Sequence, residues 1–128
     1  YMSLLCKFRG GDLYKMCVAV APVTNWRFYD SIYTERFMGL PSANAKGYDD
    51  NSPLHFTSLL KGGMLLMHGT FDDNVHIQHS MRLTEKLIGE EKPFEMQFYP
   101  DRNHNIYGGG ATLHLYERMW EYVTRELM

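Results

Sequence analysis

A chain of 128 residues has the length of one domain, and it is long enough to bury a real hydrophobic core. Hydrophobic residues at 45% and charged residues at 22% lie near the averages of globular proteins, so the composition excludes a disordered chain. A net charge of −2 with both signs interspersed gives neither the basic stripe of a nucleic-acid-binding protein nor the polybasic segment of a membrane-surface protein.

The first half of the chain is predicted to hold one buried strand between helices. Apolar residues on several sides indicate a helix over residues 1–9, and a short apolar run over residues 16–21 is typical of a buried parallel strand. Helical spacing of aromatic and apolar residues predicts a second helix over residues 28–38. A polar loop over residues 42–52 and a short helical segment near residues 53–60 follow.

The second half of the chain is predicted to hold two further strands, each followed by a helix. An apolar run over residues 64–68 indicates a strand, and apolar positions three or four apart predict an amphipathic helix over residues 75–88. Residues 94–99 alternate as in a strand near a sheet edge, and the last helix is predicted at Ala111–Leu127. Long crossovers between the strands predict an α/β fold with three parallel strands in a three-layer αβα arrangement. No internal repeat and no shift in composition marks a second domain.

Two polar side chains follow consecutive strands and could perform acid–base chemistry. Asp72 comes after the second strand, and His104 lies in a polar loop after the third. Because catalytic groups gather at the carboxyl ends of strands in open α/β sheets, both side chains should face one crevice. An aspartate followed by a histidine is the order of the last two members of a Ser…Asp…His triad in α/β-hydrolases. In such a triad the carboxylate orients the imidazole, which acts as general base.

Each of these residues also has a simpler interpretation. Asp72 could be a helix cap, and His104 could be an ordinary histidine of a surface loop. A metal site is a third possibility, because Asp72, His76 and His79 are spaced to share one face of a helix. The H-E-x-x-H motif is absent and no cysteine joins this set. The order of Asp72 and His104 on consecutive strands favours catalysis.

The nucleophile of the triad is missing from this sequence. A hydrolase places its serine in a G-x-S-x-G turn between a strand and a helix, and the chain contains no such motif. The serines that lack this context are Ser3, Ser31, Ser42, Ser52, Ser58 and Ser80. Cys6 and Cys17 lie in buried-looking segments and offer no replacement. Two cysteines are also too few for a disulfide framework, so the redox compartment stays open.

Three stretches of the sequence carry specific motifs. They are residues 18–36, which include Asn-Trp-Arg-Phe-Tyr-Asp, residues 68–76, His-Gly-Thr-Phe-Asp-Asp-Asn-Val-His, and residues 101–104, Asp-Arg-Asn-His. Together they resemble the dipeptidyl peptidase IV branch of the prolyl oligopeptidase family of serine peptidases, in which bacterial members have a similar Tyr-Pro-Asp-Arg-Asn-His stretch. The resemblance covers essentially the whole chain. In one departure, asparagines flank the last histidine where many relatives carry Asp and Gly.

The resemblance implies a peptidase that removes dipeptides from peptide N-termini after Pro or Ala through a seryl acyl-enzyme, without a cofactor. In that interpretation Asp72 orients His104, which activates the serine and then protonates the leaving amine. The residues implied for an apolar proline pocket, and for a hydrogen bond to a substrate carbonyl, are Val23, Trp26, Tyr29, Tyr33, Val75 and Asn74. Aromatic walls suit a flat aliphatic ring, although Tyr29 and Tyr33 could equally be packing residues of a helix.

The resemblance also implies a longer polypeptide. In the family, the Gly-x-Ser-x-Gly-Gly turn is followed at once by a residue that matches Tyr1. We therefore expect residues 1–128 to be a partial α/β-hydrolase peptidase domain that lacks the nucleophile and the upstream strands, and to be inactive alone. The expected partners are a peptide with penultimate Pro or Ala and the rest of the same polypeptide, including a β-propeller. A homo-oligomer is also expected, because the first strand would present an unpaired edge.

Two other classes of function remain open at this stage. The chain could belong to a non-catalytic binding or scaffold module on the same fold, or to a hydrolase of different specificity such as an esterase or an acylaminoacyl peptidase. The family resemblance alone implies a periplasmic, extracellular or cell-surface location.

Overall fold

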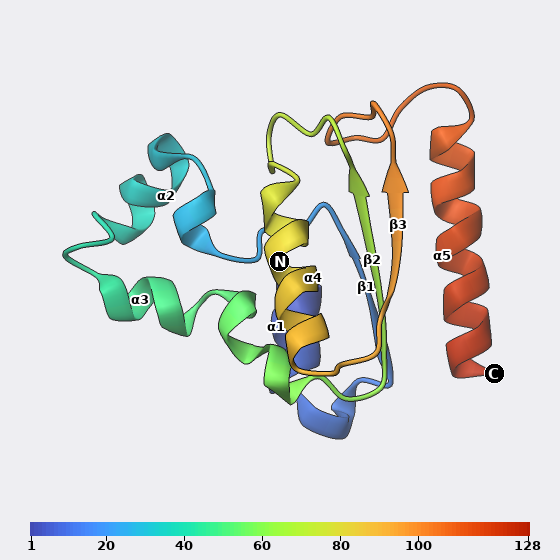
Figure 1. The fold of residues 1–128 in the computed structure, drawn as a ribbon, viewed down its shortest axis with the longest axis horizontal. Coiled ribbons are helices and arrows are strands. Elements are labelled where there is room, and N and C mark those ends of the chain that lie inside the picture. The colour runs from blue at the N-terminus through green and yellow to red at the C-terminus, as the bar shows by residue number, and fades with distance from the viewer.

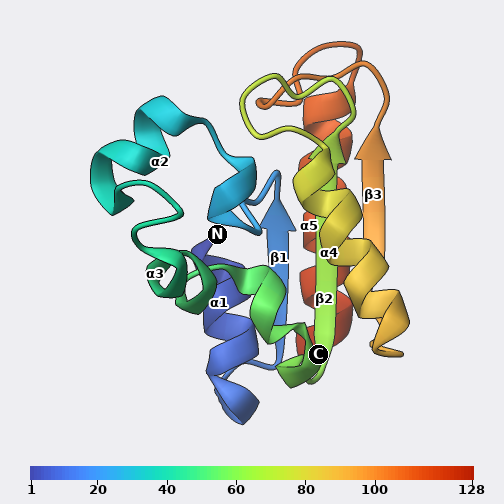
Figure 2. The same cartoon turned by 60° about the vertical axis from the view of Figure 1, so that its left-hand side comes forward.

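Three parallel strands form the middle layer of the fold, namely β1 (Met16–Val20), β2 (Gly63–Gly69) and β3 (Glu95–Tyr99). The computed structural model describes residues 1–128 and places the strands in the order β1-β2-β3, side by side in Figure 2. The interior of β2 is fully buried, because a strand that is covered on both faces has to be apolar on both. The predicted α/β class with three parallel strands is confirmed.

Helices cover both faces of this sheet, as Figure 1 shows. α1 (Met2–Arg9) and α4 (Gln78–Gly89) lie on one face and α5 (Ala111–Leu127) lies on the other, so the predicted three layers are confirmed. The core under α1 and α4 consists of Leu4, Phe8, Cys17, Ala19, Leu60, Met64, Leu66, Leu83 and Leu87. The core under α5 consists of Leu65, Met67, Tyr99, Ile106, Leu115 and Tyr122. Successive residues of β2 thus serve opposite faces, as the period of a strand requires.

The segment between β1 and β2 stands to one side of the sheet (Figure 1). It contains 3-10 turns at Trp26–Phe28 and Pro53–Leu59 and the short helices α2 (Ser31–Met38) and α3 (Ala45–Asp50). The helix predicted over residues 28–38 begins only at Ser31, where the side chain of Asp30 accepts the N–H of Tyr33 (2.8 Å) as an N-cap.

Two further predicted boundaries are wrong. The loop predicted over residues 42–52 contains α3, because the side chain of Asn44 accepts the N–H of Gly47 and caps a helix of six residues. α4 begins at Gln78 and not near residue 75, because the preceding residues form a separate turn around Asp72.

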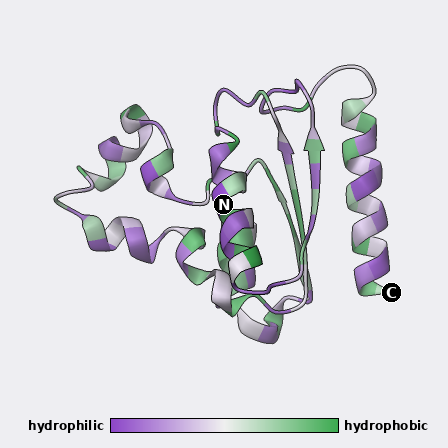
Figure 3. Cartoon of the chain, in the orientation of Figure 1, coloured by the Kyte–Doolittle hydropathy of each residue, from purple (hydrophilic) through white to green (hydrophobic).

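α5 begins and ends at the residues that the sequence predicts. Apolar and polar residues alternate along this helix in Figure 3, and Leu115 and Tyr122 are its buried members. Glu95 of β3 forms ion pairs with Arg118 and Arg125, which hold the outer strand to the helix. None of the helices combines the length and the hydropathy that a membrane span needs.

Candidate active site

Asp72 lies in the turn that follows β2, and it is only 3% exposed. One carboxylate oxygen, Oδ1, accepts the backbone N–H groups of Asn74 (3.0 Å) and Val75 (2.8 Å). Asp72 therefore does stabilise a turn, although this turn precedes α4 and is not its N-cap. The other oxygen, Oδ2, takes no part in the turn and faces His104.

His104 lies in the loop after β3 and reaches this second oxygen. Its Nδ1 is 2.8 Å from Asp72 Oδ2. Because a carboxylate can only accept, Nδ1 carries the proton of the neutral ring and Nε2 keeps a lone pair. The side chain of His104 is 35% exposed, whereas that of Asp72 is fully buried. The pair thus presents a proton-accepting nitrogen toward solvent with an anchored carboxylate behind it, as in the acid–base half of a triad.

Backbone contacts between the two loops fix this arrangement. Thr70 N–H donates to the Tyr99 carbonyl (3.0 Å), and Phe71 N–H donates to the Arg102 carbonyl (3.0 Å). Gly69 permits this approach, because a Cβ at that position would lie 2.2 Å from the Arg102 carbonyl oxygen. The glycine at the end of β2 is therefore a requirement of the site.

Ile106 anchors the other side of the His104 loop. Its N–H donates to the Asn103 carbonyl (3.0 Å), its own carbonyl accepts the Thr112 hydroxyl (3.1 Å), and its side chain is fully buried. The backbone φ of Ile106 is 55°, which is unusual for a β-branched residue. Such strain persists only where the surrounding contacts over-determine the conformation, and it is frequent near functional sites.

A second histidine contacts the same carboxylate. His68, near the carboxyl end of β2, is fully buried, and its Nε2 lies 2.8 Å from the Val75 carbonyl oxygen and 3.2 Å from Asp72 Oδ2. Its Nδ1 lies 2.6 Å from Ser80 Oγ. Burial lowers the pKa of His68 even though the Val75 carbonyl and Asp72 oppose that shift. Sequence reasoning assigned neither His68 nor Ser80 a role. The sequence did contain one signal for His68, namely that this polar residue stands in an apolar run that forms a buried strand.

Three of the residues implied for the proline pocket form an aromatic cluster. The ring centroids of Tyr29 and Tyr33 are 5.5 Å apart, and Trp26 lies 6.1 Å from Tyr29 and 6.2 Å from Tyr33. The Tyr29 hydroxyl donates to Asn74 Oδ1 (2.8 Å), which joins the cluster to the Asp72 turn. Burial is the main reason that the pKa of Tyr29 is raised, so its phenol keeps the proton that it donates.

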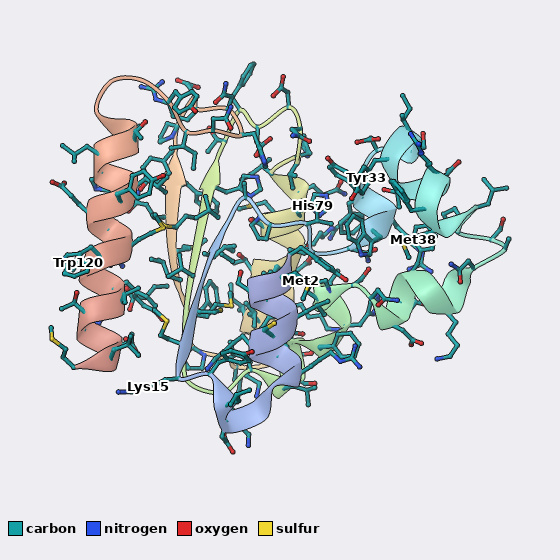
Figure 4. The ribbon with its side chains drawn as sticks, turned by 180° about the vertical axis from the view of Figure 1, so that it is seen from behind. Met2, Lys15, Tyr33, Met38, His79 and Trp120 are labelled. Carbon is teal, nitrogen blue, oxygen red and sulfur yellow. The ribbon has the colours of Figure 1, made fainter.

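A pocket of about 280 Å³ opens beside this cluster. It is lined by Tyr1, Trp26, Tyr33, Thr34, Phe37, Met38 and Asn51. Figure 4 shows Tyr33 and Met38 on the side of the molecule away from α5. Of the other implied residues, Tyr29 and Asn74 meet beside the pocket, Val75 is buried in the Asp72 turn, and Val23 is buried beyond the end of β1.

The metal-site interpretation of the sequence is wrong in its geometry. Asp72 and His76 precede α4, so they do not share a helix face with His79. The Nδ1 of His79 instead accepts the N–H of Thr24 (3.0 Å). No group of three or more His, Cys, Asp or Glu side chains in the chain is arranged to hold a metal ion.

Parallel strands that are followed first by an aspartate and then by a histidine hydrogen-bonded to it match the order of the last two triad members in the α/β-hydrolases. The model of the prolyl oligopeptidase family matches residues 1–128, and the chain belongs to that family.

Relatives with this similarity are much longer than the chain. The crystal structure of Porphyromonas gingivalis dipeptidyl peptidase 4 is 48% identical, with a TM-score of 0.95 over 97% of this chain and 18% of that one. The "probable dipeptidyl-aminopeptidase B" of Aspergillus oryzae is 45% identical over 85% of this chain and 12% of its own length. A protein of the same description from Coccidioides posadasii is 44% identical over 88% of this chain and 12% of its own length. The chain therefore corresponds to a small part of each relative.

Proposed function

We propose that this chain is the carboxyl-terminal part of the peptidase domain of a serine-type dipeptidyl peptidase, which removes dipeptides from peptide N-termini after Pro or Ala. The observation that carries the proposal is the 2.8 Å hydrogen bond between His104 and Asp72 at the carboxyl edge of the sheet. Relatives named as a dipeptidyl peptidase or as probable dipeptidyl-aminopeptidases, which match most of this chain at 44–48% identity, support it.

In this proposal His104 Nε2 accepts the proton of a serine hydroxyl while the serine oxygen attacks the scissile carbonyl carbon. Asp72 holds the imidazole in position and stabilises the imidazolium that forms. His104 then protonates the leaving amine, and it later accepts a proton from the water that hydrolyses the acyl-enzyme. His104 makes its hydrogen bond with Asp72 and none with a serine hydroxyl of this chain, and we assign the nucleophile to another part of a longer polypeptide.

The aromatic cluster supports a preference for proline. Trp26, Tyr29 and Tyr33 offer ring surfaces, which suit a flat aliphatic side chain that makes no hydrogen bonds. Asn74 Oδ1 accepts a hydrogen bond from the Tyr29 hydroxyl, so the amide nitrogen of Asn74 is turned to the other side. That nitrogen is a donor only, and we assign it to a carbonyl oxygen of the substrate.

Substrate profiling of the longer polypeptide that carries this chain tests the proposal. The kcat/KM should be highest for Gly-Pro and Gly-Ala reporters and much lower for an acylated amino-acid reporter or a simple ester. Preference for either of the latter would instead support an acylaminoacyl peptidase or an esterase. A folded protein that turns over none of these substrates would support a non-catalytic module.

The 128 residues alone should show no peptidase activity. Without a serine beside His104 the nucleophilic route is lost, and only the modest acceleration from binding groups remains. The purified chain is incubated with a Gly-Pro reporter, and the longer polypeptide at the same molar concentration serves as the positive control. Turnover by the chain alone that is abolished by His104→Gln would overturn this part of the proposal.

A further inference from the structure

We propose that His68 is a positioning residue for the Asp72–His104 pair, donating its Nε2–H to the same carboxylate oxygen that His104 uses. The inference rests on the proposed function of the pair and adds two members to it, His68 and Ser80. His68 Nδ1 is hydrogen-bonded to Ser80 Oγ, and its Nε2 is hydrogen-bonded to the Val75 carbonyl oxygen and also lies 3.2 Å from Asp72 Oδ2, so the proposed donation to Asp72 shares the Nε2–H with Val75.

The contacts of His68 determine which nitrogen carries the proton. Nε2 faces two groups that can only accept, the Val75 carbonyl oxygen at 2.8 Å and Asp72 Oδ2 at 3.2 Å. If Nε2 carried no proton, its lone pair would face the lone pairs of two acceptor oxygens, with no water to separate them because His68 is fully buried. The proton therefore resides on Nε2, and Nδ1 is left as an acceptor.

Ser80 completes this assignment from α4. Its side chain is fully buried and its Oγ lies 2.6 Å from His68 Nδ1. Since Nδ1 carries no proton in this tautomer, the hydroxyl donates and the histidine accepts. The helix thus fixes the tautomer of His68, as the second partner of a functional histidine usually does.

The result is a carboxylate that is held at both oxygens. Oδ1 of Asp72 accepts two backbone N–H groups of its own turn, and Oδ2 faces His68 and His104. With these contacts in place the carboxylate cannot rotate away from His104. Because the two imidazoles share one oxygen, the donation from His68 also limits how strongly that oxygen attracts the proton of His104.

If His68 only filled space in the core, its replacement would have a different outcome. Such a residue would tolerate replacement by an apolar side chain of similar size, with no effect on His104. His68→Met removes the donor while roughly keeping the volume, and His68→Gln keeps an N–H group that can reach the same acceptors. His79→Met, at another fully buried histidine that makes no contact with Asp72, is the matched control.

The direct test is NMR of the 128-residue chain with 15N-labelled histidine. Long-range 1H–15N correlations of the wild type should show the Nε2–H tautomer at His68, and this measurement needs no variant to fold. The low-field resonance of the His104 Nδ1–H should move in His68→Met, stay near its wild-type position in His68→Gln, and not move in His79→Met. A proton on Nδ1 of His68, or a folded His68→Met chain with an unmoved His104 resonance, overturns the inference.

Kinetics in the longer polypeptide supply a second readout. His68→Met should lower kcat for a Gly-Pro reporter by about tenfold to a hundredfold, because a small misplacement of the base has effects of that order. The KM should stay unchanged, and His68→Gln should restore most of kcat. An unchanged kcat in His68→Met contradicts the inference, whereas a wild type without turnover contradicts the proposed function and leaves the NMR result to decide on His68.

Discussion

His79 is a buried side chain whose surroundings oppose its charge. It belongs to the first turn of α4 (Figure 4), it is fully buried, and its Nδ1 accepts the N–H of Thr24 in the segment after β1. Nε2 is buried without a hydrogen-bond partner. Burial lowers the pKa of His79 to about 4, and the nearby Phe28 backbone offsets this only in part. The neutral ring is thus a condition of the native packing.

This pKa predicts a loss of stability in mild acid. The unfolded chain binds a proton at His79 below a pKa of about 6.5, but the folded chain does so only below about 4, so the free energy of unfolding falls as the pH decreases across that window. The His79 contribution is about 3 kcal/mol. Urea unfolding of the chain should therefore show a shallower pH dependence between pH 6.5 and 4 in His79→Gln.

His76→Gln, at an exposed histidine three residues earlier, is the control and should keep the wild-type slope. Burial also lowers the pKa of His68, so part of the slope should remain in His79→Gln. An unchanged slope in His79→Gln would show that the ring is not held neutral.

At the residue scale, the sequence predicts catalytic residues where their order along the chain is typical of a known catalytic arrangement. Asp72 and His104 could be proposed because each follows an apolar strand and the two come in triad order. The contact of His68 with Asp72 and Ser80 could not be predicted. It depends on how β2 and α4 are rotated toward each other, which no local pattern specifies.

At the scale of elements, the site is built from two loops that are joined through their backbones. Gly69 permits a close approach to the Arg102 carbonyl, two residues before His104. Two backbones that approach this closely leave no room for a methyl group, so the side chain at this position controls the spacing of the loops.

Gly69→Ala should therefore disturb both stability and the site. We expect a loss of about 1–3 kcal/mol in the free energy of unfolding, which is typical of overpacking, together with a lower kcat in the longer polypeptide. Gly89→Ala is the matched control, because a Cβ there meets no atom within 4 Å, and it should leave both quantities nearly unchanged. Equal effects of the two substitutions on unfolding in urea would contradict this account of the loops.

The elements themselves were predictable to different degrees. β2 and α5 follow from a continuous apolar run and from a long helical period, which are strong signals. α3 has six residues including Gly47, and its stability depends on the cap from Asn44, so its periodicity is too short to recognise. The late start of α4 has a similar cause, since the hydrogen bonds of Asp72 decide it.

At the scale of the whole molecule, β1 has a partner on one side only. β1 pairs with β2, and beside it opens an apolar groove of about 460 Å³ between α1, β1 and α5. The lining of this groove consists of Met2, Ser3, Cys6, Lys7, Tyr14, Met16, Cys17, Val18 and Val123. An unpaired strand next to an apolar groove is a surface that favours association with another strand.

The isolated chain should consequently self-associate as its concentration rises. Light scattering measures this directly, and Val20→Lys, which places a charge at the end of β1, should shift the chain toward monomer. Ile32→Lys, at an 88% exposed position on α2, should not. A monodisperse monomer of the wild-type chain at every concentration would contradict the prediction.

The central claim is that Asp72 and His104 are the acid and the base of a serine-peptidase triad. The most direct measurement is kcat of the longer polypeptide on a Gly-Pro reporter for Asp72→Asn and for Asp73→Asn, the exposed neighbour. An asparagine at position 72 can keep the turn contacts but no longer selects the Nδ1–H tautomer of His104, so kcat should fall by about 10⁴-fold. Asp73→Asn should retain nearly wild-type activity. An Asp72→Asn enzyme with activity close to that of Asp73→Asn would contradict the account.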